Sequence, residues 1–113
     1  MSRLPTALEA ASLVRSAQAT GDFATVLKKG DPDRGALLLV ISSRGRHVAC
    51  LERVLSFETG QYRWQRSGPI EDAAPEELRD FLARRTRSDD DLWLIELDIA
   101  QAERFIAETT AEG

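Results

Sequence analysis

The sequence has one cysteine and one histidine in 113 residues. One cysteine cannot form an internal disulfide and one histidine cannot build a histidine-rich metal site. The longest stretch without a charged residue, Gly35 to Ser43, is far shorter than the ~20 residues that span a bilayer. Near the start, Glu9 and Arg15 interrupt the apolar residues before these could form the core of a signal peptide. We therefore expect a cytoplasmic protein with no membrane association.

Motifs for catalysis and cofactor binding are also missing. Gly45 and Gly60 are isolated turn glycines, with no phosphate-binding or dinucleotide fingerprint around them. His47 and Cys50 stand three residues apart on a predicted strand, so their side chains are expected on opposite faces and not as a nucleophile and its base. We predict no catalytic residues and no cofactor, and the sequence favours a protein that is not an enzyme.

Two acidic turns offer oxygen ligands of the kind that Mg²⁺ or Ca²⁺ binds, namely Asp31 with Asp33 and the run Asp89 to Asp91. Neither has the spacing of a calcium-binding loop. A metal-dependent hydrolase that joined Asp33 to Glu52 would also need a lysine two residues later, where Val54 stands. The favoured interpretation is turn chemistry without a metal, and cation binding by these turns stays open.

The composition of the chain is that of one folded domain. Hydrophobic residues make up 42% of the chain and charged residues 30%, which is ordinary for a globular protein and too apolar for a disordered one. A chain of this length buries roughly two-thirds of its extended surface, enough for one core. We predict a single domain over residues 1–113.

Three helices are expected from apolar residues at helical spacing. The first covers Pro5–Thr20, with Thr6 and Glu9 spaced as a capping box. The second begins at Pro75, and the third follows Asp98, which we expect to be its N-cap.

Five strands are expected between turn signals. Their ranges are Phe23–Lys29, Ala36–Ile41, His47–Leu55, Gln61–Arg66 and Leu92–Leu97. The unbroken apolar run Ala36–Ile41 is typical of a strand buried on both faces, covered by helices on both sides or by a partner subunit on one. The order predicts an α+β fold: helix, four-stranded and mainly antiparallel meander, helix, strand, helix.

Three stretches carry a resemblance to known proteins: Arg3-Leu4-Pro5-Thr6, Gly30-Asp31-Pro32-Asp33-Arg34-Gly35 running into Ala36 to Val40, and Asp91-Leu92-Trp93-Leu94-Ile95-Glu96-Leu97-Asp98. In these motifs the chain resembles a family of short bacterial proteins that is classified only as a domain of unknown function. The resemblance covers nearly the whole chain and implies a bacterial protein. It brings no activity, ligand or site residue with it.

The basic residues supply the candidate binding surface. Tyr62, Trp64 and Arg66 alternate onto one face of the fourth strand, and Arg44 and Arg46 lie at the turn between the second and third strands. Arginines beside strand aromatics hold single-stranded nucleic acid in several sheet modules, by stacking and phosphate contact. The alternative interpretation is a core tryptophan with a solvated charged surface. A sequence pI near 5.0 does not suit tight, non-specific nucleic-acid binding.

Charge is divided unevenly along the chain. Residues 1–68 carry ten basic and six acidic side chains, a net charge of +4. Residues 69–113 carry five basic and thirteen acidic side chains, a net charge of −8. Because opposite charges attract, we expect the acidic part to lie against the basic sheet of the same chain or of a second copy. The leading hypothesis is a non-enzymatic protein that acts by self-association or by docking a protein partner through its sheet. Weak binding of single-stranded nucleic acid or a nucleotide is the alternative.

Overall fold

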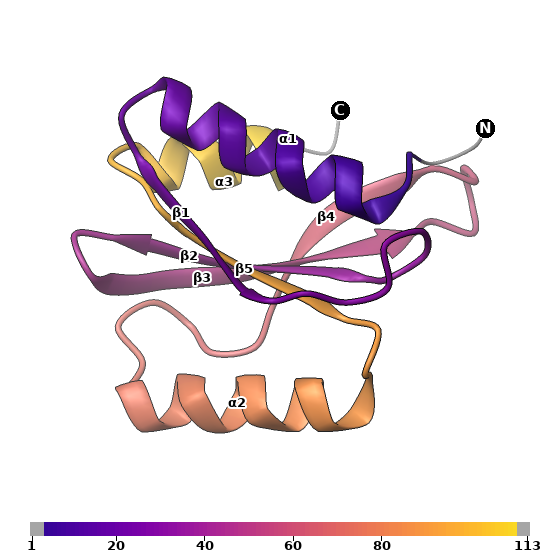
Figure 1. Ribbon diagram of the computed structural model, residues 1–113. Coiled ribbons are helices and arrows are strands. Elements are labelled where there is room, and N and C mark those ends of the chain that lie inside the picture. Colours follow the sequence, from indigo (N-terminus) through magenta and orange to yellow (C-terminus); the bar gives the residue numbers. More distant parts are fainter. Residues whose placement is uncertain (1–3, 111–113) are drawn as a thin grey trace.

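In the computed structural model, which describes residues 4–110, three helices and five strands follow one another in the predicted order (Figure 1). The helices are α1 (Thr6–Ala19), α2 (Pro75–Ser88) and α3 (Ala102–Thr110). The strands are β1 (Phe23–Lys28), β2 (Leu37–Ser43), β3 (Arg46–Leu55), β4 (Tyr62–Ser67) and β5 (Trp93–Asp98). The predicted α+β class is therefore confirmed. Across residues 4–110, no helix combines the length and the apolar character needed to cross a membrane.

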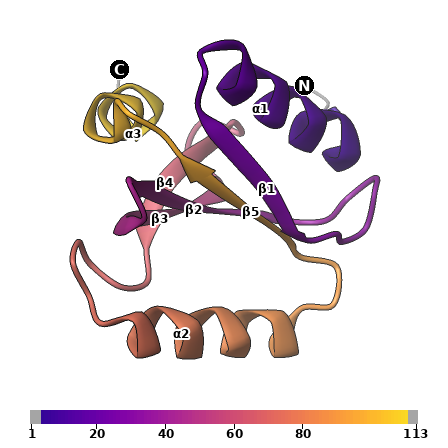
Figure 2. The same cartoon turned by 60° about the vertical axis from the view of Figure 1, so that its left-hand side comes forward.

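All five strands join one mixed sheet in the order β1-β5-β2-β3-β4. Strands β2, β3 and β4 form the predicted antiparallel run, and β5 pairs in parallel with β2 and antiparallel with β1. Between β4 and β5 the chain crosses one face of the sheet as α2 (Figure 2). The sheet is thus mainly antiparallel, as predicted, with one parallel pairing.

One pairing differs from the predicted meander, because β5 lies between β1 and β2. Strand β2 buries six of its seven residues and β5 four of its six, whereas β1 buries none. Strands that are apolar on both faces are stable at the centre of a covered sheet, and a half-polar strand is stable at its edge. Apolar content, and not adjacency along the chain, therefore decides the place of β1.

Hydrogen bonds hold the connection between β1 and β2 against the start of β5. The indole Nε1 of Trp93 donates to the carbonyl of Asp31 at 2.7 Å, and the Asp31 N–H donates to the carbonyl of Asp91 at 3.0 Å. A Cβ on Gly30 or Gly35 would overlap the Asp91 carbonyl. The two glycines are thus needed for close approach of two backbones, which gives this turn motif a packing role.

Helices cover both faces of the sheet (Figure 2). Helices α1 and α3 lie over one face, here called the α1/α3 face, and α2 lies over the other, the α2 face. The α1/α3 core contains Leu39, Ile95 and Ile106, and the α2 core contains Val40 and Leu94. The expectation that β2 is buried on both faces is confirmed, with helices on both sides.

Two expected helix caps are wrong. Thr6 lies inside α1 after Pro5, and its buried hydroxyl donates to the carbonyl of Gly35 at 2.8 Å, so it forms no capping box with Glu9. Asp98 ends β5 and accepts the backbone N–H groups of the β2–β3 turn instead of capping α3. In both cases a tertiary contact uses the side chain that local spacing had assigned to a cap.

Candidate functional site

The five residues of the predicted binding surface lie in two places. Tyr62, Trp64 and Arg66 share the α1/α3 face of β4, opposite Leu55, Arg53 and Leu51 of β3. Arg44 lies in the β2–β3 turn and Arg46 begins β3, at the end of that strand far from Tyr62. The alternation along β4 is as predicted, but the structure does not bring the two groups together.

The ring of Trp64 is engaged within the protein. Trp64 is half-buried and packs against the α1/α3 core. The guanidinium carbon of Arg53 lies 4.9 Å from its ring centroid and 6.0 Å from that of Tyr62. The same guanidinium forms an ion pair with the buried carboxylate of Glu9 in α1. Arg53 therefore fastens α1 to β4 and occupies an aromatic face that nucleic-acid stacking would use.

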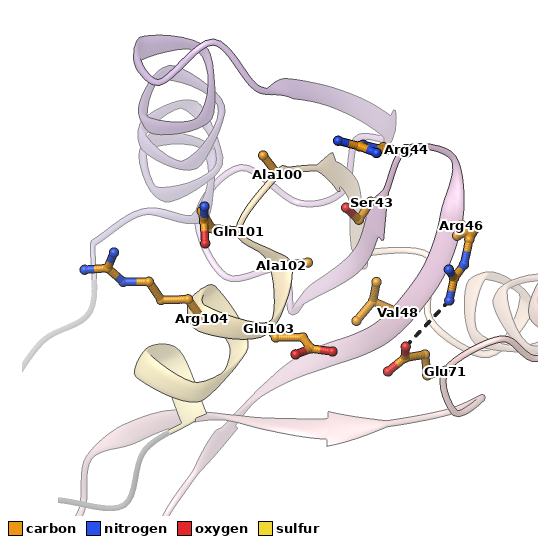
Figure 3. A pocket seen from close by; sticks show the side chains of 10 residues that line it. All are labelled: Ser43, Arg44, Arg46, Val48, Glu71, Ala100, Gln101, Ala102, Glu103 and Arg104. Carbon is orange, nitrogen blue, oxygen red and sulfur yellow. Dashed lines mark ion pairs between the residues drawn. The ribbon is translucent and has the colours of Figure 1, made fainter.

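Arg44 and Arg46 line a cavity of about 430 Å³ between the β2–β3 turn and the start of α3 (Figure 3). Arg46 donates to the carboxylate of Asp72 at 2.8 Å and lies 3.7 Å from that of Glu71. Figure 3 shows Arg46 directed toward Glu71, with Glu103 also in the lining. Acidic groups from the second half of the chain thus offset this arginine, and the cavity carries mixed charge.

The two acidic turns use their carboxylates to hold their own backbones. Asp31 Oδ2 accepts the N–H groups of Asp33 at 3.2 Å and Arg34 at 2.7 Å. Asp89 Oδ1 accepts the N–H of Asp91 at 3.0 Å. Among residues 4–110, no three His, Cys, Asp or Glu side chains are grouped so that they could hold a metal ion. The turn chemistry predicted for these residues is present.

The expectation that His47 and Cys50 face opposite sides is wrong. The β2–β3 register shifts between Ile41 and Ser42, so His47 lies opposite Ser42 and Cys50 opposite Val40, on the same α2 face. A bulge adds one residue and thereby reverses the alternation. Burial, and secondarily Glu52, raise the pKa of the Cys50 thiol to about 12, which suppresses the thiolate that nucleophilic chemistry requires.

The feature that sequence reasoning missed is the outer side of β4. The Ser56 N–H donates to the carbonyl of Gln61 at 2.8 Å where the β3–β4 hairpin closes. Hydrogen-bonded and non-hydrogen-bonded pairs alternate along an antiparallel ladder, so the backbone N–H and C=O groups of Tyr62, Trp64 and Arg66 point away from β3. We call these three residues' outward backbone the β4 edge.

The β4 edge is regular over its whole length. All six β4 residues pair with β3 without a register shift, and no strand of the described residues lies beyond β4. At the opposite end of the sheet, β1 has a register shift between Val26 and Lys28. Bulges and lysines are devices that keep an edge from pairing with another chain. The sequence contains a sign of this difference between the two edges: Lys28-Lys29 stands at the end of β1, whereas β4 has no lysine and no proline.

Comparison with known proteins identifies relatives but no activity. A family described as "Protein of unknown function (DUF1491)" matches residues 4–107. The chain is similar to a crystal structure of a DUF1491 family protein from Caulobacter crescentus CB15, at 28% identity and a TM-score of 0.77, covering 91% of this chain and 94% of that one. An NMR structure of a DUF1491 family protein from the same organism matches at 28% identity and a TM-score of 0.75, covering 90% and 91%.

A third structure extends the likeness to another organism. The solution structure of protein Atu0922 from A. tumefaciens matches at 27% identity and a TM-score of 0.70, covering 86% of each chain. No curated protein matches this chain. The resemblance inferred from the turn and strand motifs is confirmed, and the fold is that of the solved relatives.

Proposed function

The chain belongs to the DUF1491 family, and we propose that it is a non-enzymatic protein that docks an extended protein segment by strand addition at the β4 edge. The single observation that carries this proposal is the regular, outward-facing backbone of Tyr62, Trp64 and Arg66 in the terminal strand. In strand addition, main-chain hydrogen bonds supply the affinity and alternate side chains supply the specificity.

The β4 edge is long enough to pair with a short strand. Trp64 and Arg66 each direct one N–H and one C=O outward, so a docked strand makes up to about four backbone hydrogen bonds with them, each worth roughly 1 kcal/mol net. Exposed apolar side chains adjoin the edge at the β3–β4 hairpin, where Phe57 is 95% and Tyr62 43% exposed. These supply the apolar contact that backbone pairing alone lacks.

We also propose that the protein works in the bacterial cytoplasm. Its lone cysteine is buried and forms no disulfide, which suits a reducing compartment. The solved relatives come from Caulobacter crescentus and A. tumefaciens.

Selection from a displayed library of random octapeptides tests strand addition without a known partner. Arg66→Pro removes one outward N–H, and an edge strand tolerates proline where its N–H faces solvent. Arg66→Ala removes the same side chain but keeps the N–H, and is the matched control. We expect peptides selected on the wild-type protein to bind Arg66→Ala comparably and Arg66→Pro at least ten-fold more weakly. No enrichment, or equal binding to both variants, would overturn the proposal.

A further inference from the structure

We infer that the cavity between α1 and β1, here called the α1/β1 cavity, binds a small carboxylate with an apolar body, of the kind that a medium-chain fatty acid presents. The cavity has a volume of about 380 Å³ and lies on the α1/α3 face, at the edge of the sheet opposite β4. This inference goes beyond the proposed function, because it uses neither the β4 edge nor a protein partner. It follows from the apolar walls of the cavity and from the two cations that line it.

Small side chains on α1 leave the space open. Helix α1 runs beside β1 (Figure 2), and its Ala7, Ala10 and Ala11 line the cavity. The other wall is formed by Val26 of β1 and Trp93 of β5. Protein interiors are otherwise closely packed, and a methyl group is too short to fill the space between a helix and a strand. The volume that remains lies within the usual range for a site that binds a small molecule.

The apolar walls are fixed by contacts within the protein. Trp93 is only 7% exposed, and its indole Nε1 donates to the carbonyl of Asp31 at 2.7 Å. Ala10 is 2% exposed and belongs to the same hydrophobic core as Trp93. A site whose walls are already ordered does not lose affinity to the cost of ordering them.

Two cations supply the charge that an anionic head group needs. Arg15 of α1 and Lys29, directly after β1, line the cavity, and both residues are exposed. Among residues 4–110, neither side chain takes part in an ion pair or in a side-chain hydrogen bond. The lining contains no acidic residue. Because these cations stay in contact with water, a carboxylate beside them keeps part of its hydration and avoids the cost of burying a charge.

The charge of its lining distinguishes this cavity from two others. In the cavity beside the β2–β3 turn, Arg46 lies 3.7 Å from Glu71. In a cavity of about 290 Å³ between α1 and α3, Arg104 lies 3.5 Å from Glu108. A carboxylate of the chain itself offsets the arginine in both cases. In the α1/β1 cavity the cations are not offset in this way, so the anion that complements them is a ligand.

Three ten-carbon probes that differ only in the charge of the head group test the inference: decanoate, decanol and decyltrimethylammonium. Calorimetric titration of the 113-residue protein should give decanoate a dissociation constant of about 0.1 to 1 mM. The neutral and cationic probes should bind at least about five-fold more weakly. Decanol leaves water more readily than decanoate does, so a cavity that acted through apolar contact alone would prefer decanol. Equal or tighter binding of decanol would therefore overturn the inference.

Substitutions separate the charge from the cavity. Arg15→Met and Lys29→Met each remove one cation and keep the stem, and each should weaken decanoate binding about three- to five-fold without changing that of decanol. Ala11→Leu fills the cavity and should weaken both probes about ten-fold. The control Ala19→Leu places the same side chain at the exposed end of α1 and should weaken neither. Thermal melts check that each variant is folded, and the two charge variants keep the test decisive if Ala11→Leu is not.

Amide chemical shifts locate the bound probe, and we expect the largest changes in α1 and at the end of β1. Largest changes in α3 or in the β2–β3 turn, or decanoate binding that all three cavity variants leave intact, would overturn the inference. Sedimentation with phosphatidylglycerol vesicles distinguishes a dissolved acid from a lipid surface, and binding to vesicles without binding of decanoate would also overturn it. Strand addition is measured separately by the octapeptides and the Arg66 variants, so either idea fails without the other.

Discussion

The two edges of the sheet differ in what they expose. Strand β1 exposes the larger apolar side chains, with Phe23 73% and Leu27 48% exposed, but its ladder is interrupted. Strand β4 exposes mainly arginine, glutamine and tyrosine, but all six of its residues pair in one register. Ranking the two strands by the apolar side chains that they themselves expose would choose β1 as the interface. Ranking them by accessible and regular backbone chooses β4, and strand addition depends on the backbone.

A cationic side chain helps to hold each edge strand in place, and the two do so through different contacts. Lys28 binds two backbone carbonyls from the half-exposed end of β1. Arg53 belongs to β3 and lies beside β4, where it pairs with the buried Glu9 and stacks on Trp64. The anchor of β4 is thus part of the core and that of β1 is peripheral. This difference predicts that changes near β4 cost more stability than equivalent changes near β1.

The largest effect is expected for Arg53→Met. It keeps the aliphatic stem but removes a cation that pairs with Glu9, whose side chain is only 10% exposed. Removing one partner of a buried pair is strongly destabilising, and we expect a loss of about 3 kcal/mol in the free energy of unfolding, measured by urea denaturation.

The control for Arg53 is the double variant Glu9→Leu/Arg53→Met, in which an apolar pair replaces the ion pair. Such replacements are often neutral, so most of the lost stability should return. If the single variant lost less than about 1 kcal/mol, Arg53 would not be the anchor of β4, and the contrast between the edges would disappear.

An intermediate effect is expected from Cys50, which lies on β3 directly opposite Ser67 of β4. Burial raises the pKa of its thiol from 9.0 to about 12 in the folded protein. Below pH 9 the thiol is protonated in both states and has no effect. Between pH 9 and 12 the unfolded chain loses the proton and the folded chain keeps it, so stability falls by about 1.4 kcal/mol per pH unit.

The difference in unfolding free energy between the wild type and Cys50→Ala, followed from pH 8 to pH 10.5, isolates this contribution from other groups. The wild type should lose its advantage progressively above pH 9. A constant difference over that range would mean that solvent reaches Cys50 in the folded state, and hence that the ladder between β3 and β4 opens locally.

The elements themselves were accessible from the sequence, because their signals are local. The apolar run of β2 indicated a strand covered on both faces, and the turn glycines and prolines separated the strands within about two residues of their observed ends. The order of strands is not local. It depends on β5 competing with β1 for the place beside β2, and hydrophobic periodicity carries no information on which strands pair.

The candidate site, too, could be predicted only where its signals are local. That Tyr62, Trp64 and Arg66 share a face followed from the alternation of a strand. That Arg53 covers Trp64 while reaching Glu9, 44 residues earlier, follows only from tertiary packing. The outward direction of the β4 backbone depends in turn on where β4 lies in the sheet, so the edge could not be distinguished before its neighbours were known.

The smallest effect is expected for Lys28→Met, which removes the ammonium but keeps the stem. Lys28 is only half-buried, so its hydrogen bonds to backbone carbonyls are weakened by solvent, and we expect a loss of about 1 kcal/mol in the free energy of unfolding. Lys29→Met removes the same charge from an exposed neighbour and should stay within about 0.5 kcal/mol of wild type. Amide exchange should quicken in β1 and not in β4. Equally faster exchange in β4 would mean that the two edge strands are not anchored independently, and the contrast between them would disappear.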